Sequence, residues 1–311
     1  MAASPPPPPP PTSSEDILRD ASSEDILNDA LAFLGGEPVV ESTDDDGIRY
    51  GPLRLSANTL LADHLFSPAL SLAELIERGR IPLDGRAVIE LGAGTGLPSI
   101  LLSTRKPIAP PLPLANDASP PTSLIVVTDH PDPTILGNLQ ANVARNQHLV
   151  APGCTLNCAG YEWGTDVGHL LSLLPPHLPG FTTLILSDLL HFGDAHDALV
   201  ASITKLSART PEARVYVAAG NYTKPAVCAN FVRVAREAGL IIDEVLPDDS
   251  QSPSEVSTAP RQPVDAENIR KEFTNLLHPE WLGTLEVGGL DKEALALRKA
   301  ACKLWIARWP Q

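Results

Sequence analysis

One short stretch, residues 87–98 with the sequence AVIELGAGTGLP, constrains the fold of this chain more than any other. An apolar strand is predicted to end in Glu90, a glycine-rich turn follows, and Pro98 opens an apolar helix, where proline is favoured in the first turn. Glycine lets a backbone approach a ligand closely, and a helix N-terminus presents unpaired N–H groups. A strand, a glycine turn and a helix in this order predict a nucleotide-binding turn.

The spacing of the glycines distinguishes between kinds of nucleotide-binding turn. Gly92, Gly94 and Gly96 follow a Gly-x-Gly-x-Gly pattern directly after Glu90, whereas dinucleotide-binding enzymes carry Gly-x-Gly-x-x-Gly. The third glycine of the dinucleotide pattern would fall at Leu97. A dinucleotide-dependent oxidoreductase is therefore the weakest of the alternatives.

Apolar strands and amphipathic helices alternate along the rest of the chain. We expect strands at residues 87–91, 124–128, 155–159, 181–186, 215–219, 240–246 and 304–309, and helices at 59–66, 67–79, 97–104, 133–146, 194–208 and 226–238. This alternation predicts an α/β doubly wound sheet, in which ligands bind at the carboxyl ends of the strands. The acids and glycines of interest fall at those ends.

A second acid, Asp129, ends the predicted strand at 124–128. An acid in this position can hydrogen-bond both hydroxyls of a ribose. Asp129 lies 39 residues after Glu90, whereas about 20 residues are usual, and a proline-rich insertion accounts for the excess. The alternative is a turn residue before Pro131, because Asp-x-Pro is a common turn pattern. The clean apolar strand before Asp129 favours the ligand role.

Composition divides the chain into two parts. Residues 1–45 contain an unbroken proline run and two copies of the sequence SSEDIL, and they are predicted to be a disordered tail. Residues 46–311 are predicted to form one domain with loops at 105–123 and 248–266.

The charge balance limits the class of partner. The chain carries 23 Lys and Arg against 38 Asp and Glu, a net charge of −15. Acidic chains repel nucleic-acid phosphates, so nucleic acid is not expected as a direct substrate, whereas a basic protein would be attracted. The alternative is that acidity only keeps the protein in solution.

The cysteines and the hydropathy pattern point to the compartment. The four cysteines are scattered, and Cys154 and Cys158 have no matching second pair, so we expect free thiols and no metal site. No apolar run approaches the roughly 20 residues of a membrane span. These features predict a cytoplasmic protein without a membrane segment, and a monomer is the default expectation.

Four separate sequence blocks resemble one family. ELGAGTGLP resembles the first motif of S-adenosylmethionine-dependent methyltransferases with a Rossmann-like, seven-stranded sheet and helices on both faces. The blocks DHPDP at 129–133 (with asparagines in the next helix), GYEWG at 160–164 and LSDLL at 186–190 resemble the protein-lysine methyltransferases related to the human methyltransferase-like proteins. Within that branch the chain is similar to the fungal family that methylates the N-terminus and adjacent lysine of translation elongation factor 1-alpha. That family was formerly labelled nicotinamide N-methyltransferase.

The resemblance spans about residues 58–309 and implies roles for the cofactor side of the site. The methionine part of S-adenosylmethionine would lie alongside Gly92, Ala93 and Gly94. Glu90 would orient the loop or the amino group of the cofactor. Asp129 would hold the ribose.

Three further residues receive roles from the resemblance, each with a structural alternative. Trp163 would lie against the adenine, where an aromatic face adds stacking, or it is a core aromatic. Ser187 would line the cofactor pocket, or it caps a helix. Asp188 would lie at the substrate mouth, or it is a structural acid.

The chain departs from the family pattern on the substrate side. The branch carries an acid-x-x-aromatic motif, whereas this chain has Asp188-Leu189-Leu190-His191 with Phe192 one place later. The tryptophan that the branch tends to carry in its N-terminal segment is also missing near residues 55–58.

The expected reaction is methyl transfer to an amine nitrogen of a protein. The attacking amine must be neutral, so Asp188 is the candidate to orient it and accept a proton. His191 is a second candidate, because histidine titrates near neutral pH, although a structural histidine is the alternative. A small-molecule, nicotinamide-type methyltransferase and a catalytically silent binding protein with the same fold are the remaining alternatives.

Overall fold

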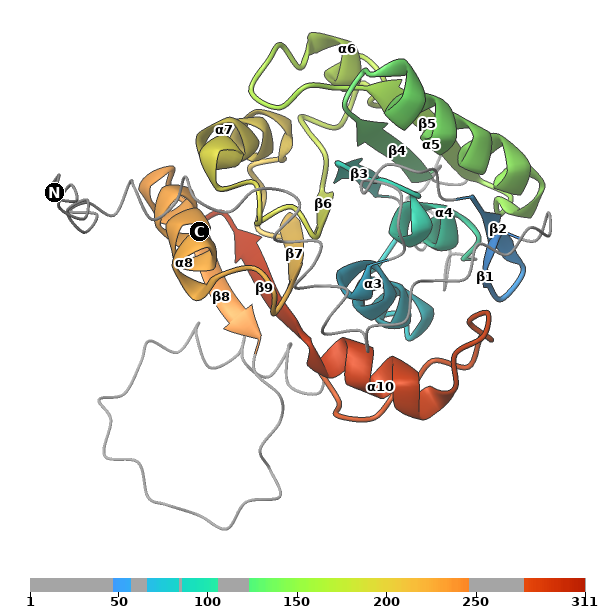
Figure 1. The fold of residues 1–311 in the computed structure, drawn as a ribbon. Helices are drawn as coiled ribbons and strands as arrows, with labels where there is room; N and C mark the ends of the chain where they lie inside the picture. Colours follow the sequence, from blue (N-terminus) through green and yellow to red (C-terminus); the bar gives the residue numbers. More distant parts are fainter. Residues whose placement is uncertain (1–46, 57–65, 84–85, 106–122, 246–276, 311) are drawn as a thin grey trace, which may run out of the picture.

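The computed structural model describes residues 47–56, 66–83, 86–105, 123–245 and 277–310 (Figure 1). The predicted tail at 1–45 and the predicted loop at 248–266 lie outside these residues. Nearly all of the predicted helix at 59–66 and of the predicted loop at 105–123 also lie outside them.

Seven strands form one sheet in the order β5-β4-β3-β6-β7-β9-β8. Neighbours from β5 to β7 are parallel, and β9 is antiparallel to both β7 and β8. The bounds are β3 (Ala87–Leu91), β4 (Ser123–Asp129), β5 (Cys154–Gly160), β6 (Thr183–Ser187), β7 (Arg214–Gly220), β8 (Ile241–Val245) and β9 (Cys302–Arg308). Each strand matches a predicted one, so the doubly wound, seven-stranded fold is confirmed.

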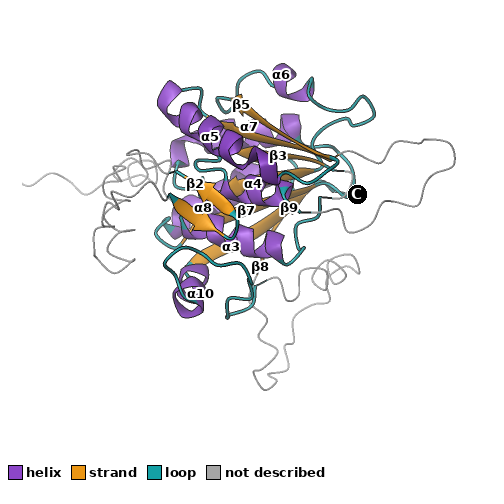
Figure 2. Cartoon of the chain, turned by 90° about the vertical axis from the view of Figure 1, so that its right-hand side faces the viewer, coloured by secondary structure: helices purple, strands orange, loops and turns teal. Residues whose placement is uncertain are grey.

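Helices cover both faces of the sheet (Figures 1 and 2). The helices are α3 (Ser67–Glu77), α4 (Leu97–Ser103), α5 (Pro133–Asn146), α6 (Gly168–Leu171), α7 (His196–Leu206), α8 (Pro225–Glu237) and α10 (Lys292–Ala300). Side chains alternate across a strand, so Val88 packs into the core with α3, α4, α5 and α10, whereas Ile89 packs into the core with α6, α7 and α8.

Local sequence explains where the helices next to the site begin and end. Asp132 caps α5 by accepting hydrogen bonds from the backbone N–H groups of Thr134 and Ile135, and Pro133 occupies the first turn, as both residue types prefer. Pro225 likewise opens α8, and Gly239 follows its end with a left-handed φ of 91°. Gly239 therefore stops the helix in the way glycine commonly does.

A short hairpin precedes the sheet and was not predicted. It consists of β1 (Ile48–Tyr50) and β2 (Leu53–Leu55), which are too short to show an alternating pattern. Asparagines on α5 hold β2 and the residue that follows it. Asn146 Oδ1 accepts from the Arg54 N–H at 3.0 Å, and Asn142 Oδ1 accepts from the Ser56 N–H at 2.8 Å. Asn142 belongs to the sequence block that follows Asp129, and here it anchors the N-terminal segment.

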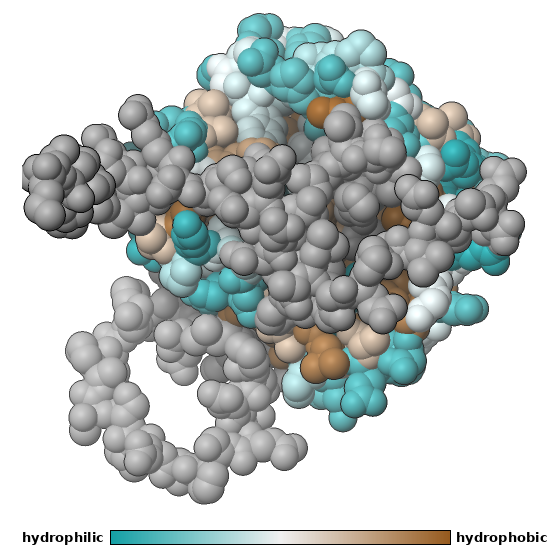
Figure 3. Space-filling model, in the orientation of Figure 1, coloured by the Kyte–Doolittle hydropathy of each residue, from teal (hydrophilic) through white to brown (hydrophobic). Residues whose placement is uncertain are grey.

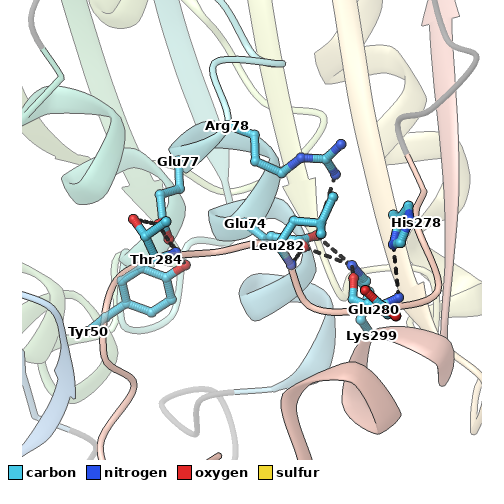
Figure 4. Close-up of polar contacts among 9 residues, drawn as sticks. All are labelled: Tyr50, Glu74, Glu77, Arg78, His278, Glu280, Leu282, Thr284 and Lys299. Atoms are coloured by element: carbon cyan, nitrogen blue, oxygen red, sulfur yellow. Dashed lines mark hydrogen bonds and ion pairs between the residues drawn. The ribbon is translucent and has the colours of Figure 1, made fainter. Parts of the chain in front are cut away.

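A segment at residues 277–290 runs across α3 and leads into α10 (Figure 4). Buried carboxylates on α3 accept its backbone N–H groups: Glu74 from Leu282, and Glu77 from Thr284 and Leu285. Lys299 on α10 forms a buried ion pair with Glu74. We call Glu74, Glu77 and Lys299 the α3 cluster, and it attaches the C-terminal part of the chain to the core.

The visible described surface is mostly hydrophilic over α5 and α6, and apolar atoms appear near α10 (Figure 3). Leu297 on α10 is 68% exposed, which is ordinary for a single surface leucine. None of the helices in the described residues has the length and apolar character that crossing a membrane requires.

Candidate active site

The carboxyl ends of four parallel strands bring the predicted site residues to one edge of the sheet. Pairing in register aligns Glu90 with Val127, two residues before Asp129, and Asp129 with Gly160 at the end of β5. Ser187 ends β6 beside β3. Residues that are distant in sequence therefore surround one turn, the glycine turn between β3 and α4.

The glycine turn adopts a backbone that glycine favours. Gly92, Gly94 and Gly96 have φ angles of 55°, 55° and 78°, in the left-handed region that other residues avoid. The N–H of Ala93 donates to the carbonyl of Thr128 at 2.9 Å. The turn is thus attached to β4, which carries the second acid.

Asp129 makes a second connection between β4 and the glycine turn. Its Oδ2 accepts a hydrogen bond from the Gly94 N–H at 2.7 Å, and its Oδ1 accepts one from the His130 N–H at 2.7 Å. Burial raises the pKa of this carboxyl. A carboxylate has about four acceptor sites, so these two bonds leave capacity for ribose hydroxyls.

Glu90 is fully buried beneath the turn. Its Oε2 accepts from the Ser99 N–H at 3.0 Å, at the start of α4. Its Oε1 has no hydrogen-bond partner among the described residues. Burial raises the pKa of Glu90 to about 8. A buried acceptor without a partner is costly, so a donor supplied by a bound group would relieve that cost.

Trp163 follows β5 and lies over the glycine turn. A Cβ placed on Gly92 would come within 2.9 Å of the Trp163 ring and 2.7 Å of the Leu189 side chain. The ring centroid of Trp163 lies 5.7 Å from that of Phe192, at an interplanar angle of 70°. Trp163 also packs against the core, so its ring contacts both the core and the glycine turn.

The geometry fits S-adenosylmethionine, the cofactor that the resemblance implies. Three left-handed glycines allow close approach to the backbone, Asp129 has spare acceptor capacity, and Glu90 presents a buried oxygen without a partner among the described residues. Within the same residues no group of three or more His, Cys, Asp or Glu side chains could hold a metal ion.

Asp188 follows β6 in an unusual conformation. It has a φ of 63°, and no other non-glycine residue in the described part of the chain has a positive φ. Its carboxyl accepts hydrogen bonds from the Tyr222 hydroxyl and, at 3.4 Å, from the Gly220 N–H. Burial raises its pKa to about 6. With 7% of its surface exposed, Asp188 is more enclosed than a residue at an open mouth.

Tyr222 is the functional candidate that sequence reasoning missed. It comes two residues after the carboxyl end of β7, the kind of position that drew attention to Asp129 and Asp188. That signal was available, but a tyrosine in a polar loop carries no motif that links it to an acid 34 residues earlier.

His191 lies close to Phe192, with ring centroids 3.9 Å apart. Burial lowers the pKa of His191 to about 4, because a buried imidazole resists acquiring charge. The expectation that it titrates near neutral pH is therefore wrong, and His191 is neutral at physiological pH. Ser187 is not a helix cap, because α7 begins only at His196.

Comparison with known proteins agrees with this geometry. A family model described as lysine methyltransferase matches residues 57–225. The protein N-terminal and lysine N-methyltransferase of Gibberella zeae is 30% identical over 204 residues, which cover 61% of this chain and 70% of that protein. The enzyme of the same name from Schizosaccharomyces pombe is 28% identical over 199 residues, covering 62% and 71%.

Similarity to solved structures is weak by comparison. The C-terminal domain of precorrin-6Y C5,15-methyltransferase from Rhodobacter capsulatus gives a TM-score of 0.36 at 12% identity, covering 78% of this chain and 88% of that one. The assignment therefore rests on the sequence matches. Because the family model covers more than half of the 311 residues, the chain belongs to the lysine methyltransferase family.

Proposed function

We propose that this chain transfers a methyl group to an amine of a protein, either an N-terminal amine or a lysine side chain. The observation that carries this proposal is the placement of two buried acids, Glu90 and Asp129, against the same left-handed glycine turn. The relatives with about 30% identity are named protein N-terminal and lysine N-methyltransferases, which supports a protein as the substrate.

On the cofactor side, the residues of this chain bind and orient S-adenosylmethionine. S-adenosylmethionine supplies an electrophilic methyl group on its sulfonium. Residues 92–94 let the methionine part pass close to the backbone. Asp129 would hold the ribose through its remaining acceptor sites, and Glu90 Oε1 would accept from the amino group. Trp163 would stack on the adenine, and Ser187 would line the pocket.

On the substrate side, Asp188 receives the amine. An amine must lose its proton before it can attack, and a carboxylate both attracts the ammonium and accepts or relays a proton. The raised pKa of Asp188, about 6, brings this carboxyl closer to the pH at which it works. His191 is neutral and is the second candidate to accept a proton, although its pKa of about 4 makes it a weak base.

Elongation factor 1-alpha is the protein substrate to test first. It is the substrate of the fungal family that the sequence blocks resemble, and the net charge of −15 favours approach of a basic protein. We place the enzyme in the cytoplasm as a monomer, with the methyltransferase domain at residues 46–311 and a tail before it.

The test combines cofactor binding with product analysis. Calorimetry of S-adenosylmethionine binding should give a micromolar Kd for the wild type. The Asp129→Ala variant should bind at least tenfold more weakly, because it loses both the ribose acceptor and the bond that holds Gly94. Mass spectrometry should then find methyl groups on the N-terminus or a lysine of unmethylated elongation factor 1-alpha.

Three results would contradict the proposal. Methylation of nicotinamide with no methylation of the protein would make this chain a small-molecule methyltransferase. Cofactor binding without turnover on either substrate would make it a silent binding protein. Absence of cofactor binding by the wild type would remove the methyltransferase assignment of the site.

A further inference from the structure

The tyrosine that follows β7 is folded back toward β6 by its own loop. The Thr223 N–H donates to the Gly220 carbonyl at 3.0 Å, and the Asn221 N–H donates to the Ala301 carbonyl at 2.8 Å, which together fix a tight turn. A Cβ on Gly220 would lie 2.2 Å from Cε1 of Tyr222. The ring therefore lies directly over Gly220, and only glycine fits beneath it.

This position of the ring places the Tyr222 hydroxyl next to the carboxyl of Asp188. The hydroxyl donates to Oδ2, while the Gly220 N–H of the same turn approaches Oδ1 at 3.4 Å. The Asp188 N–H donates to the Ala218 carbonyl at 2.8 Å, so the backbone of Asp188 is also attached to β7. These contacts hold a left-handed aspartate, a conformation that persists only when its surroundings impose it.

We infer that Tyr222 is a positioning residue for methyl transfer, because its hydroxyl holds the Asp188 carboxyl at the carboxyl end of β6 and favours the ionised form of that carboxyl. The inference rests on the proposed function, in which Asp188 receives the substrate amine. Tyr222 does this from the loop after β7, the strand next to β6. In this chain His191 occupies the motif position where the family usually has a tyrosine or phenylalanine.

The direction of the effect follows from the groups around Asp188. Burial raises the pKa of Asp188 and the Tyr222 hydrogen bond lowers it, for a net value of about 6. The pKa values of the Cys302 and Cys228 thiols are raised, partly by Asp188. His191 is neutral above about pH 4. Burial and Asp188 raise the pKa of Tyr222 well above its usual 10, so its hydroxyl remains a donor at every working pH.

Removing the hydroxyl should therefore raise the pKa of Asp188 further. The Tyr222→Phe variant keeps the ring over Gly220 and loses only the donor. We expect the acid limb of its kcat/KM profile, measured with S-adenosylmethionine and unmethylated elongation factor 1-alpha, to move upward by about one pH unit. On that limb the variant should then be about tenfold less active than the wild type at the same pH. The alkaline plateau should stay within a few fold of the wild type.

Tyr50→Phe is the matched control. It also removes a phenol that donates to a buried carboxylate, Glu77, but that carboxylate belongs to the α3 cluster. Its acid limb should coincide with that of the wild type. The Kd of S-adenosylmethionine should be unchanged in both variants. In an Asp188→Asn background, Tyr222→Phe should add no further effect, because the two side chains act as one unit.

A carboxyl titration separates this inference from the proposed function. Carbon-13 NMR of the full-length protein should show a higher pKa for Asp188 in Tyr222→Phe than in the wild type, with or without a substrate. An unchanged carboxyl pKa, or an acid limb that stays in place, would overturn the inference. Failure of the wild type to methylate elongation factor 1-alpha, with the titration moved as expected, would instead count against the proposed function.

Discussion

Two regions of this protein bury carboxylates, and the two regions differ in how completely hydrogen-bond donors satisfy those carboxylates. Both carboxylates of the α3 cluster accept hydrogen bonds at both of their oxygens, whereas at the carboxyl edge of the sheet one oxygen of Glu90 has no partner among the described residues. Both regions lie against the same seven-stranded sheet, so the difference is local. It separates carboxylates that hold the fold from acids at the edge where we propose that the cofactor and the substrate bind.

In the α3 cluster the donors come from distant parts of the chain. Glu74 accepts from the Leu282 N–H at 2.6 Å and from Lys299 Nζ at 2.8 Å. Glu77 accepts from Thr284, Leu285 and the Tyr50 hydroxyl. A buried carboxylate with this many donors has little capacity for a ligand, so the cluster serves to hold the fold together (Figure 4).

At the sheet edge Glu90 is only partly satisfied, whereas Asp129 and Asp188 each accept two hydrogen bonds. Glu90 has one backbone donor, and its second oxygen has no partner among the described residues. Burial raises the pKa of Glu90, Asp129 and Asp188 in each case. Leaving buried acids short of donors costs stability, and perturbed acids of this kind gather at functional sites.

The largest effect is expected from removing the cation of the α3 cluster. Lys299→Met should lower the free energy of unfolding by about 3–5 kcal/mol, because the buried Glu74 would keep only its longer ion pair with Arg78, at 3.9 Å. Urea denaturation measures the loss. The control is Arg233→Met, which breaks an ion pair whose side chains are 57% and 62% exposed and should cost no more than about 1 kcal/mol. Equal losses in the two variants would contradict the comparison.

A smaller, pH-dependent effect is expected from Glu90. Its folded pKa of about 8 exceeds the usual glutamate value of 4.5, so its contribution to stability is complete below about pH 4.5 and is lost as pH rises toward and through 8. Between pH 5 and pH 8 the loss is on the order of 3–4 kcal/mol. Glu90→Gln should reduce this slope, and denaturation at pH 5 and pH 8 without cofactor measures it.

Glu237→Gln serves as the control for Glu90, since Glu237 is exposed on α8. Its stability should follow the wild-type slope. Asp129 and Asp188 also have raised pKa values, so some slope should persist in Glu90→Gln. A slope identical to the wild type would show that Glu90 is ionised in the folded protein.

The smallest effect is expected from removing a single donor to the α3 cluster, the Tyr50 hydroxyl. Tyr50→Phe removes the bond from the Tyr50 hydroxyl to Glu77 Oε2, while the donors on Oε1 remain. The expected loss is about 1 kcal/mol, the net value of a typical hydrogen bond. A chemical-denaturation midpoint measures it. A loss above about 3 kcal/mol would mean that the cluster fails as a unit when one donor is removed.

Local patterns predicted most of the sheet and the glycine turn beside the candidate site. The strand at Ala87–Leu91 and the glycine turn are encoded by neighbouring residues, because apolar runs form buried strands and glycines permit left-handed angles. Short elements were missed because a local pattern needs several residues to become visible. The hairpin of β1 and β2 has three residues in each strand, which is too few to show periodicity.

The sequence by itself determined which residues stand at the ends of the strands, including Glu90, Asp129 and Asp188, because a parallel sheet turns sequence order into a common edge. Only the tertiary structure decided which partners those acids have. Tyr222 meets Asp188 across 34 residues, and Lys299 meets Glu74 across 225 residues. Such contacts depend on how strands and helices pack, and burial then sets each pKa, so neither can be read from residues that are adjacent in the chain.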